Sequence, residues 1–231
     1  PDCFHAVEEL RQRLLREGYT ELRPGRWQLT AGGKYFTTKN GSSLMAFRLP
    51  QEAPAGFLLT ASHSDSPCFR LRDHAELTGE YIRLSAERYG GMINDSWLDR
   101  PLSVAGRVVV RREGGLEARL DVALIPRVAI HLNRETNSGV KYDPARDLVA
   151  LYAAGTGSGS FYREVARTAD CAPEDVVAGD LVLYNNQPGT VWGPEGEFVS
   201  APRLDDLACV FACTEGFLTA QERDMVPVLC V

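Results

Sequence analysis

The chain has 231 residues, of which 44% are hydrophobic and 24% charged, and its formal net charge is −6 at pH 7. This composition is typical of a globular protein that can bury a core in one large domain or two smaller ones. The acidic balance argues against nucleic acid or an anionic membrane as the main partner, because both attract basic surfaces.

The compartment is predicted from hydrophobic runs and cysteine usage. No apolar run approaches the roughly 20 residues needed to cross a bilayer, and no secretory leader opens the chain. The six cysteines are scattered, unlike a disulfide framework or a CxxC zinc site. We therefore predict a cytoplasmic protein with reduced, mostly buried thiols. Cys209 and Cys213, spaced i, i+4, are only a weak sign of metal binding.

The first third of the chain predicts a helix followed by a β-hairpin. Apolar residues recur at helical spacing over residues 5–17, and Gly18 ends the pattern. Two strand-like runs, 34–38 and 43–48, flank Asn40-Gly41, which is a strong hairpin signal. An edge of antiparallel strands is therefore expected before the next segment.

An apolar run at residues 57–61 ends abruptly in His63, Asp65 and Pro67. The run predicts a buried strand of an α/β sheet, with His63 and Asp65 at its carboxyl end, where such sheets place their chemistry. The i, i+2 spacing puts both side chains on the same side of an extended chain. The carboxylate could therefore orient the imidazole or share a metal with it.

The middle of the chain predicts a mostly β module, because it alternates in polarity and shows little helical periodicity. A Gly/Ser-rich stretch at 155–160 is interpreted as a solvated connector. Strands are expected at 81–85, 106–111, 128–131 and 180–184, turns at Gly90-Gly91 and Gly114-Gly115, and a helix at 173–178.

The last section predicts a helix over residues 208–220 and a buried strand over 226–231. Asp205 and Asp206 stand where this helix begins, and a helix-capping role could account for one of them. A strand-end histidine and aspartate together with a helix-start aspartate suit a divalent metal that takes nitrogen and oxygen ligands. A satisfied core histidine, an Asx turn before Pro67 and a helix cap are the structural alternatives.

Four segments in order carry a resemblance that covers nearly the whole chain. They are residues 60–67 (TASHSDSP), 97–108 (WLDRPLSVAGRV), 125–134 (IPRVAIHLNR) and 197–207 (EFVSAPRLDDL). Together they resemble the aspartyl aminopeptidase family of dinuclear zinc exopeptidases. The resemblance implies a zinc-exopeptidase-like α/β catalytic domain, incomplete at its C-terminus, with an inserted, mostly β dimerisation domain. We expect the catalytic domain at 1–67 and 189–231, and the insertion at 68–188.

The resemblance also implies roles for individual residues. His63 would be a zinc ligand, Asp65 would orient its imidazole, and Asp205 would bridge two zinc ions. His131 would reach a neighbouring subunit's active site and contact substrate, unless it faces its own domain's core. Asp206 stands where the family usually has Asn, and its role stays open. The chain starts without a methionine and stops on a predicted core strand, so residues are expected to be missing at both ends. The family's Glu-Glu pair would follow residue 231.

The expected activity is zinc-dependent hydrolysis of N-terminal residues from peptides, with Asp or Glu as the residues that eukaryotic relatives prefer. The resemblance implies two zinc ions per complete chain and a homo-oligomer, a dodecamer built from dimers. One alternative is a catalytically inactive scaffold or interaction protein on the same fold. A serine or cysteine hydrolase using Ser64 or Cys68 is a further alternative, but the chain has no GxSxG nucleophile elbow.

Overall fold

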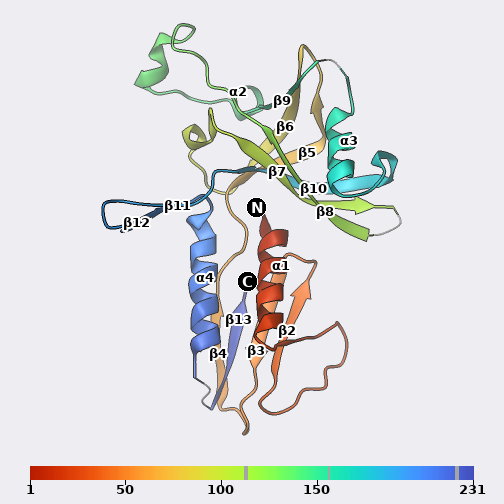
Figure 1. Cartoon of the computed structure of the whole chain (residues 1–231), viewed down its shortest axis with the longest axis vertical. Coiled ribbons are helices and arrows are strands. Elements are labelled where there is room, and N and C mark those ends of the chain that lie inside the picture. The colour runs from red at the N-terminus through yellow and green to blue at the C-terminus, as the bar shows by residue number, and fades with distance from the viewer. Residues whose placement is uncertain (112–113, 156, 222–223) are drawn as a thin grey trace. The chain divides into compact units, whose positions relative to one another are not determined.

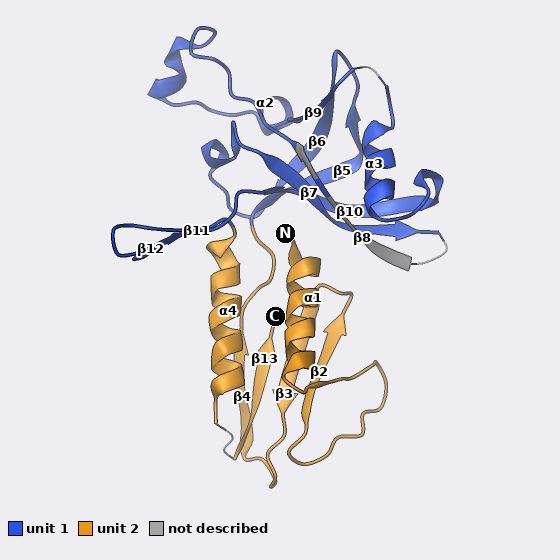
Figure 2. Ribbon diagram, viewed as in Figure 1, with its two compact units in different colours: residues 1, 67–202 blue, residues 2–66, 203–231 orange. Residues whose placement is uncertain are grey.

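The computed structural model describes residues 1–111, 114–155, 157–221 and 224–231, which form two compact units (Figures 1 and 2). Unit 2 consists of residues 2–66 and 203–231, and unit 1 consists of residues 67–202 together with Pro1. Unit 1 is therefore an insertion within the sequence of unit 2. Residues 189–202, expected in the catalytic domain, cluster with unit 1; the domain boundaries stay a prediction.

Unit 2 is a mixed sheet with two helices. Its elements are α1 (Cys3–Arg16), β1 (Thr20–Glu21), β2 (Lys34–Lys39), β3 (Ser43–Arg48), β4 (Gly56–Ala61), α4 (Leu204–Thr219) and β13 (Met225–Cys230). The strand order is β1-β2-β3-β13-β4, with β13 antiparallel to β3 and parallel to β4. The expected hairpin is confirmed: β2 pairs with β3, and Asn40 and Gly41 both have positive φ, as a tight hairpin turn requires.

The helices of unit 2 share one hydrophobic cluster with the sheet. Leu14 of α1, Phe217 of α4 and Leu229 of β13 belong to it, and all three are almost fully buried. Val226 and Val228 of the same strand belong to a second hydrophobic cluster. Successive side chains of a strand point to opposite faces of the sheet, so these two lie on the face opposite to Leu229. Buried on both faces, β13 is the buried strand that its apolar sequence predicted.

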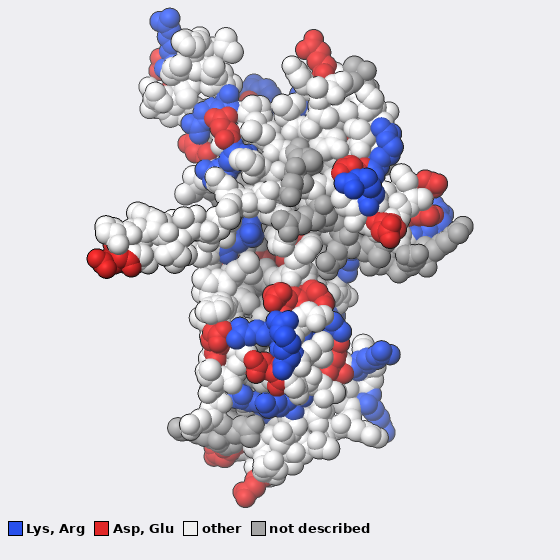
Figure 3. Space-filling model, in the orientation of Figure 1, with Lys and Arg blue, Asp and Glu red and all other residues white. Residues whose placement is uncertain are grey.

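Charged side chains on α1 connect it to neighbouring elements. Arg11 Nη2 lies 2.8 Å from Glu21 Oε2 of β1, and Arg13 Nη2 lies 2.6 Å from Glu215 Oε1 of α4. On the face shown in Figure 3, Lys and Arg side chains lie interspersed with Asp and Glu. These ion pairs are partly exposed, so each contributes at most about 1 kcal/mol.

One prediction about β4 is confirmed and another is wrong. The strand forms where the apolar run predicted it, but among the described residues it lies at the edge of the sheet and pairs only with β13. Phe57, Leu58 and Leu59 are 67%, 62% and 65% exposed. Three consecutive apolar residues predict burial on both faces, yet burial depends on which elements cover the strand. In the part of the chain that is described, these side chains remain largely uncovered.

Unit 1 is built on an antiparallel sheet. Its strands are β5 (Cys68–Leu77), β6 (Tyr81–Tyr89), β7 (Leu102–Val110), β8 (Gly114–Ala123), β9 (Ala150–Ala154) and β10 (Val176–Asn185), with a separate hairpin of β11 (Thr190–Trp192) and β12 (Phe198–Ser200). The sheet order is β8-β7-β10-β5-β6-β9. The mostly β module is confirmed. The turn expected at Gly114-Gly115 adjoins residues 112–113, which lie outside the described residues, and both glycines begin β8.

Short helical segments complete unit 1. They are η1 (Asn94–Trp97), η2 (Arg134–Ser138), α2 (Pro144–Asp147), α3 (Ser160–Thr168) and η3 (Pro173–Asp175). The helix expected at 173–178 is wrong: only a 3₁₀ turn forms there, and β10 begins at Val176. The actual helix, α3, buries Phe161 and Val165 in the unit's core, and their i, i+4 spacing was the overlooked signal.

Close contact between β7 and β10 requires a glycine. Gly106 has φ of +149°, and a Cβ there would collide with the carbonyl oxygen of Asp180 on the paired strand. Only glycine adopts this conformation without strain. Among the helices that are described, none combines the length and hydrophobicity that a bilayer crossing requires.

Candidate metal centre

The end of β4 delivers His63 to the carboxyl edge of the sheet in unit 2. The parallel ladder with β13 continues one step beyond the strand, where Ser62 N donates to Cys230 O at 3.1 Å. His63 follows immediately, with its side chain 58% exposed. This is the edge of an α/β sheet at which functional residues gather.

The start of α4 delivers two carboxylates to the same place. Arg203, with φ of +62°, holds the N-cap position without a side-chain capping bond. Asp205 and Asp206 have non-helical backbone angles at a kink within the first turn of α4. The capping role considered for one of them stays a prediction.

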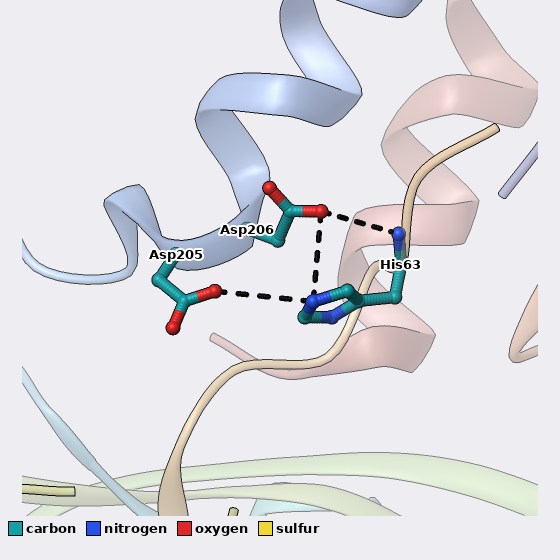
Figure 4. A group of neighbouring side chains, drawn as sticks. All are labelled: His63, Asp205 and Asp206. Carbon is teal, nitrogen blue, oxygen red and sulfur yellow. Dashed lines mark hydrogen bonds and ion pairs between the residues drawn. The ribbon is translucent and has the colours of Figure 1, made fainter. Parts of the chain in front are cut away.

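These three side chains converge (Figure 4). His63 Nε2 lies 3.8 Å from Asp205 Oδ1 and 3.5 Å from Asp206 Oδ2. The three residues each offer a ligand atom within 4.8 Å of the others, so a single cation could contact them together. Asp205 is 74% exposed, whereas Asp206 is only 17% exposed.

The opposite ring nitrogen of His63 is held by Asp65. Nδ1 lies 3.0 Å from Asp65 Oδ1 and 3.1 Å from the Asp65 backbone oxygen. When Nδ1 carries the proton and donates it to Asp65, the lone pair of Nε2 faces Asp205 and Asp206. A carboxylate that holds the far nitrogen of a metal-binding histidine in this way fixes its tautomer and raises its basicity.

The donor set fits zinc. Zinc takes imidazole nitrogen and carboxylate oxygen at about 2.0–2.2 Å with tetrahedral geometry, so two ligand atoms on one ion lie about 3.4 Å apart. The distances from His63 Nε2 to the two carboxylates, 3.8 and 3.5 Å, are close to this value. The residues that sequence reasoning selected, His63 and Asp205, are thus brought together by the fold, and Asp206 joins them.

Electrostatics favours a charged cluster. Loss of solvent acts to lower the pKa of His63. Hydrogen bonds with the backbone oxygen and the carboxylate of Asp65, together with the charges of Asp65 and Asp206, outweigh this effect, so the pKa of His63 lies above 6.5. Hydrogen bonds from the Cys209 thiol and then from Ser62 hold the pKa of Asp206 below 3.8. The Asp206 carboxylate is therefore ionised at neutral pH.

His131 belongs to unit 1, and its local structure differs from the prediction. Residues 128–131 do not form the expected strand; Leu132 N and Asn133 N both donate to Ala129 O, which makes a turn. The apolar residues there are exposed, Val128 by 55% and Leu132 by 84%. Alternation alone predicted a strand, but the segment has no ladder partner among the described residues. The role of His131 stays a prediction.

The chain is similar to known aminopeptidases in sequence and in fold. The chain is 38% identical over 247 residues to a probable M18 family aminopeptidase 2 from Clostridium novyi, covering 99% of the chain and 57% of that relative. It superposes on a chain of the cryo-EM structure of the Ape4 and Nbr1 complex with a TM-score of 0.93, at 27% identity, covering 100% of this chain and 51% of that one. Its TM-score with the mApe1 dodecamer of S. cerevisiae is 0.81, at 26% identity, covering 100% and 57%.

An α/β unit whose sequence is interrupted by a β-rich insertion matches the predicted fold class, which is thereby confirmed. The Peptidase M18 profile, described as aminopeptidase I zinc metalloprotease (M18), matches residues 1–231. The chain therefore belongs to the M18 family of zinc aminopeptidases, and the predicted family resemblance is confirmed. It spans 57% of the length of the curated relative from Clostridium novyi.

Proposed function

We propose that this chain contributes part of the active site of a two-zinc aminopeptidase that hydrolyses N-terminal residues from peptides. The observation that carries the proposal is the convergence of His63 with Asp205 and Asp206 in a member of a zinc metalloprotease family. Bound zinc would supply a Lewis acid for the scissile carbonyl and would lower the pKa of a bound water towards about 7.

The chain's own residues have distinct tasks in this proposal. His63 offers Nε2 to one zinc, and Asp65 keeps the proton on Nδ1 so that Nε2 is free to bind. Asp205, whose carboxylate is exposed, would be a ligand shared by the two zinc ions. A preference for substrates with N-terminal Asp or Glu is proposed on the family resemblance alone.

We further propose that the protein acts as a homo-oligomer, a dodecamer built from dimers, in the cytoplasm. The S. cerevisiae mApe1 structure that this chain resembles is a dodecamer. His131 would contact substrate in a neighbouring subunit, and its exposed position in a turn of the β-rich unit supports this assignment. The scattered cysteines support a reducing compartment.

The test combines metal analysis with peptide cleavage by the intact protein. We expect about two zinc ions per chain, release of N-terminal residues, and loss of cleavage on chelation. His63→Asn and Asp205→Ala should each lower zinc content and cleavage. Two exposed residues of β5, Asp73 and His74, provide matched controls, since His74→Asn and Asp73→Ala should change neither zinc content nor cleavage.

Two alternatives give different outcomes. An inactive scaffold on the same fold would bind no zinc, or bind it without releasing any N-terminal residue. A serine or cysteine hydrolase would retain activity after complete chelation and lose it in Ser64→Ala or Cys68→Ala. Ser64 and Cys68 are only 6% and 9% exposed, which disfavours attack on a peptide by either side chain.

A further inference from the structure

Asp206 differs from Asp205 in what already surrounds it. Its Oδ2 accepts the Ser62 hydroxyl at 2.6 Å and the His63 backbone N–H at 3.4 Å. The thiol of Cys209, one turn further along α4, also donates to this carboxylate. Three donors from two elements therefore converge on one side chain that is only 17% exposed.

Asp205 has the opposite character. It is 74% exposed, and its contact with the His63 ring, at 3.8 Å, is a long one. Its carboxylate oxygens are therefore open to ligands from solvent. Adjacent in sequence, the two aspartates face the same imidazole with very different capacity to coordinate a cation.

Counting lone pairs separates the two. Each carboxylate oxygen has two acceptor sites. On Asp206, both sites of Oδ2, the oxygen nearest to His63 Nε2, are engaged by Ser62 and by the His63 backbone. A metal at the distance that fits zinc would have to displace one of these bonds, whereas Asp205 offers its oxygens without such a loss.

We infer that Asp206 is a positioning residue that joins the strand-end segment Ser62–His63 to the first turn of α4 and so sets the separation of His63 Nε2 from Asp205. The inference is based on the hydrogen bonds from Ser62 Oγ and His63 N to Asp206 Oδ2, which join residues 144 and 143 positions apart in the chain. The inference rests on the proposed function, because the distance it controls matters only if His63 and Asp205 share a metal site.

Each of the two bonds joins the backbone segment that carries His63 to the segment that carries Asp205. Asp206 follows Asp205 directly in α4, and Ser62 precedes His63 directly after β4. Fixing Ser62 Oγ and His63 N to one oxygen therefore fixes the backbones that carry both ligands. Groups that orient metal ligands in this way typically change metal affinity 10- to 100-fold when they are removed.

The test measures zinc affinity of the intact protein by competition with a chromogenic chelator, and zinc stoichiometry by elemental analysis. Asp206→Ala should raise the zinc dissociation constant about 10- to 100-fold, and Ser62→Ala about 10-fold. Asp206→Asn should retain the full zinc stoichiometry with a change below about 10-fold, because an amide oxygen accepts the same two bonds. Ser96→Ala, which removes an exposed hydroxyl bonded to Ile93 O, is the control.

Coupling between the two partners is the second readout. If Ser62 and Asp206 act through one bond, the double variant Ser62→Ala/Asp206→Ala should bind zinc no more weakly than Asp206→Ala alone. Circular dichroism of the metal-free variants checks folding, and Asp206→Asn, which keeps the bonds, carries the test if Asp206→Ala does not fold.

Three results would overturn the inference while leaving the proposed function intact. They are the loss of a zinc equivalent in Asp206→Asn, wild-type zinc affinity in Asp206→Ala, and fully additive effects of Ser62→Ala and Asp206→Ala. The first would make Asp206 itself a ligand. If the wild-type protein bound no zinc, the proposed function and the inference would fail together.

Discussion

Arg48 is predicted to hold the far end of the helix that carries the metal-site carboxylates. Although it is charged, it is only 5% exposed. Its Nη2 donates to Ala220 O at 2.8 Å and its Nη1 to Leu218 O at 3.3 Å, at the C-terminus of α4. The guanidinium carbon also lies 5.1 Å from the centre of the Phe217 ring. We expect Arg48→Met to destabilise unit 2.

The magnitude follows from these contacts. Each hydrogen bond from a charged donor contributes about 1.5–3 kcal/mol, and the contact with the ring about 0.5–2 kcal/mol. The cost of desolvating the guanidinium, whose Nε has no partner among the described residues, offsets part of this gain. Methionine keeps the apolar stem. The net loss of unfolding free energy should therefore be about 2–4 kcal/mol.

Urea unfolding of the intact protein, followed by circular dichroism, measures this loss. Arg16→Met is the matched control, because Arg16 is 64% exposed and its ion pair with Glu9 is long, at 3.4 Å; its effect should stay within about 0.5 kcal/mol. Arg48→Lys should fall between the two. A loss below about 1 kcal/mol in Arg48→Met would refute the assigned role of the two carbonyl bonds.

Three further predictions concern the cap of α1 and the two cores. Although burial acts to raise the pKa of Asp2, its hydrogen bond with His5 and the His5 charge hold that pKa below 3.8; its stabilising charge therefore acts above pH 3.8 and is lost as the pH falls through the folded value. Asp2→Asn keeps a capping oxygen, so urea unfolding should show it less stable than wild type at pH 6, with a difference that shrinks as the pH is lowered below 3.8; equal stability at pH 6 would contradict this. Leu229→Ala, at a fully buried site in β13, should cost about 2–5 kcal/mol in the same assay, and a cost below 1 kcal/mol would mean that the site collapses around the smaller side chain. Gly106→Ala should destabilise unit 1 by more than about 2 kcal/mol through backbone strain and the clash with Asp180, seen as a lower thermal midpoint; an unchanged midpoint would show that β7 can shift away from β10.

Local patterns were enough to predict several elements. The helical period ending at Gly18, the Asn40-Gly41 turn and the apolar run before His63 each depend on neighbours a few residues apart, and the structure has α1, the β2–β3 hairpin and β4 at those places. The contact between His63 and Asp65 could also be predicted from the sequence, because the i, i+2 spacing on an extended chain puts the two side chains on the same side.

Other expectations failed where an element's neighbours decide its state. The run at Phe57 predicted a buried strand, but β4 lies at the sheet edge. Alternation at residues 128–131 predicted a strand, but a turn forms in the absence of a described partner strand. The short helix α3, by contrast, was missed although the i, i+4 spacing of Phe161 and Val165, two of its three buried residues, is a helical signal in the sequence.

The candidate metal centre could be predicted only in part from short stretches of sequence. The candidate ligands could be predicted from local sequence: an imidazole and a carboxylate after an apolar strand, and two carboxylates at a helix start. That these groups meet, and that Asp205 is exposed whereas Asp206 is bonded to Ser62, depends on the tertiary structure. The distance between His63 and Asp206, 143 positions apart, is set by the sheet order and by the packing of α4 against β4 and β13, which no short stretch of sequence specifies.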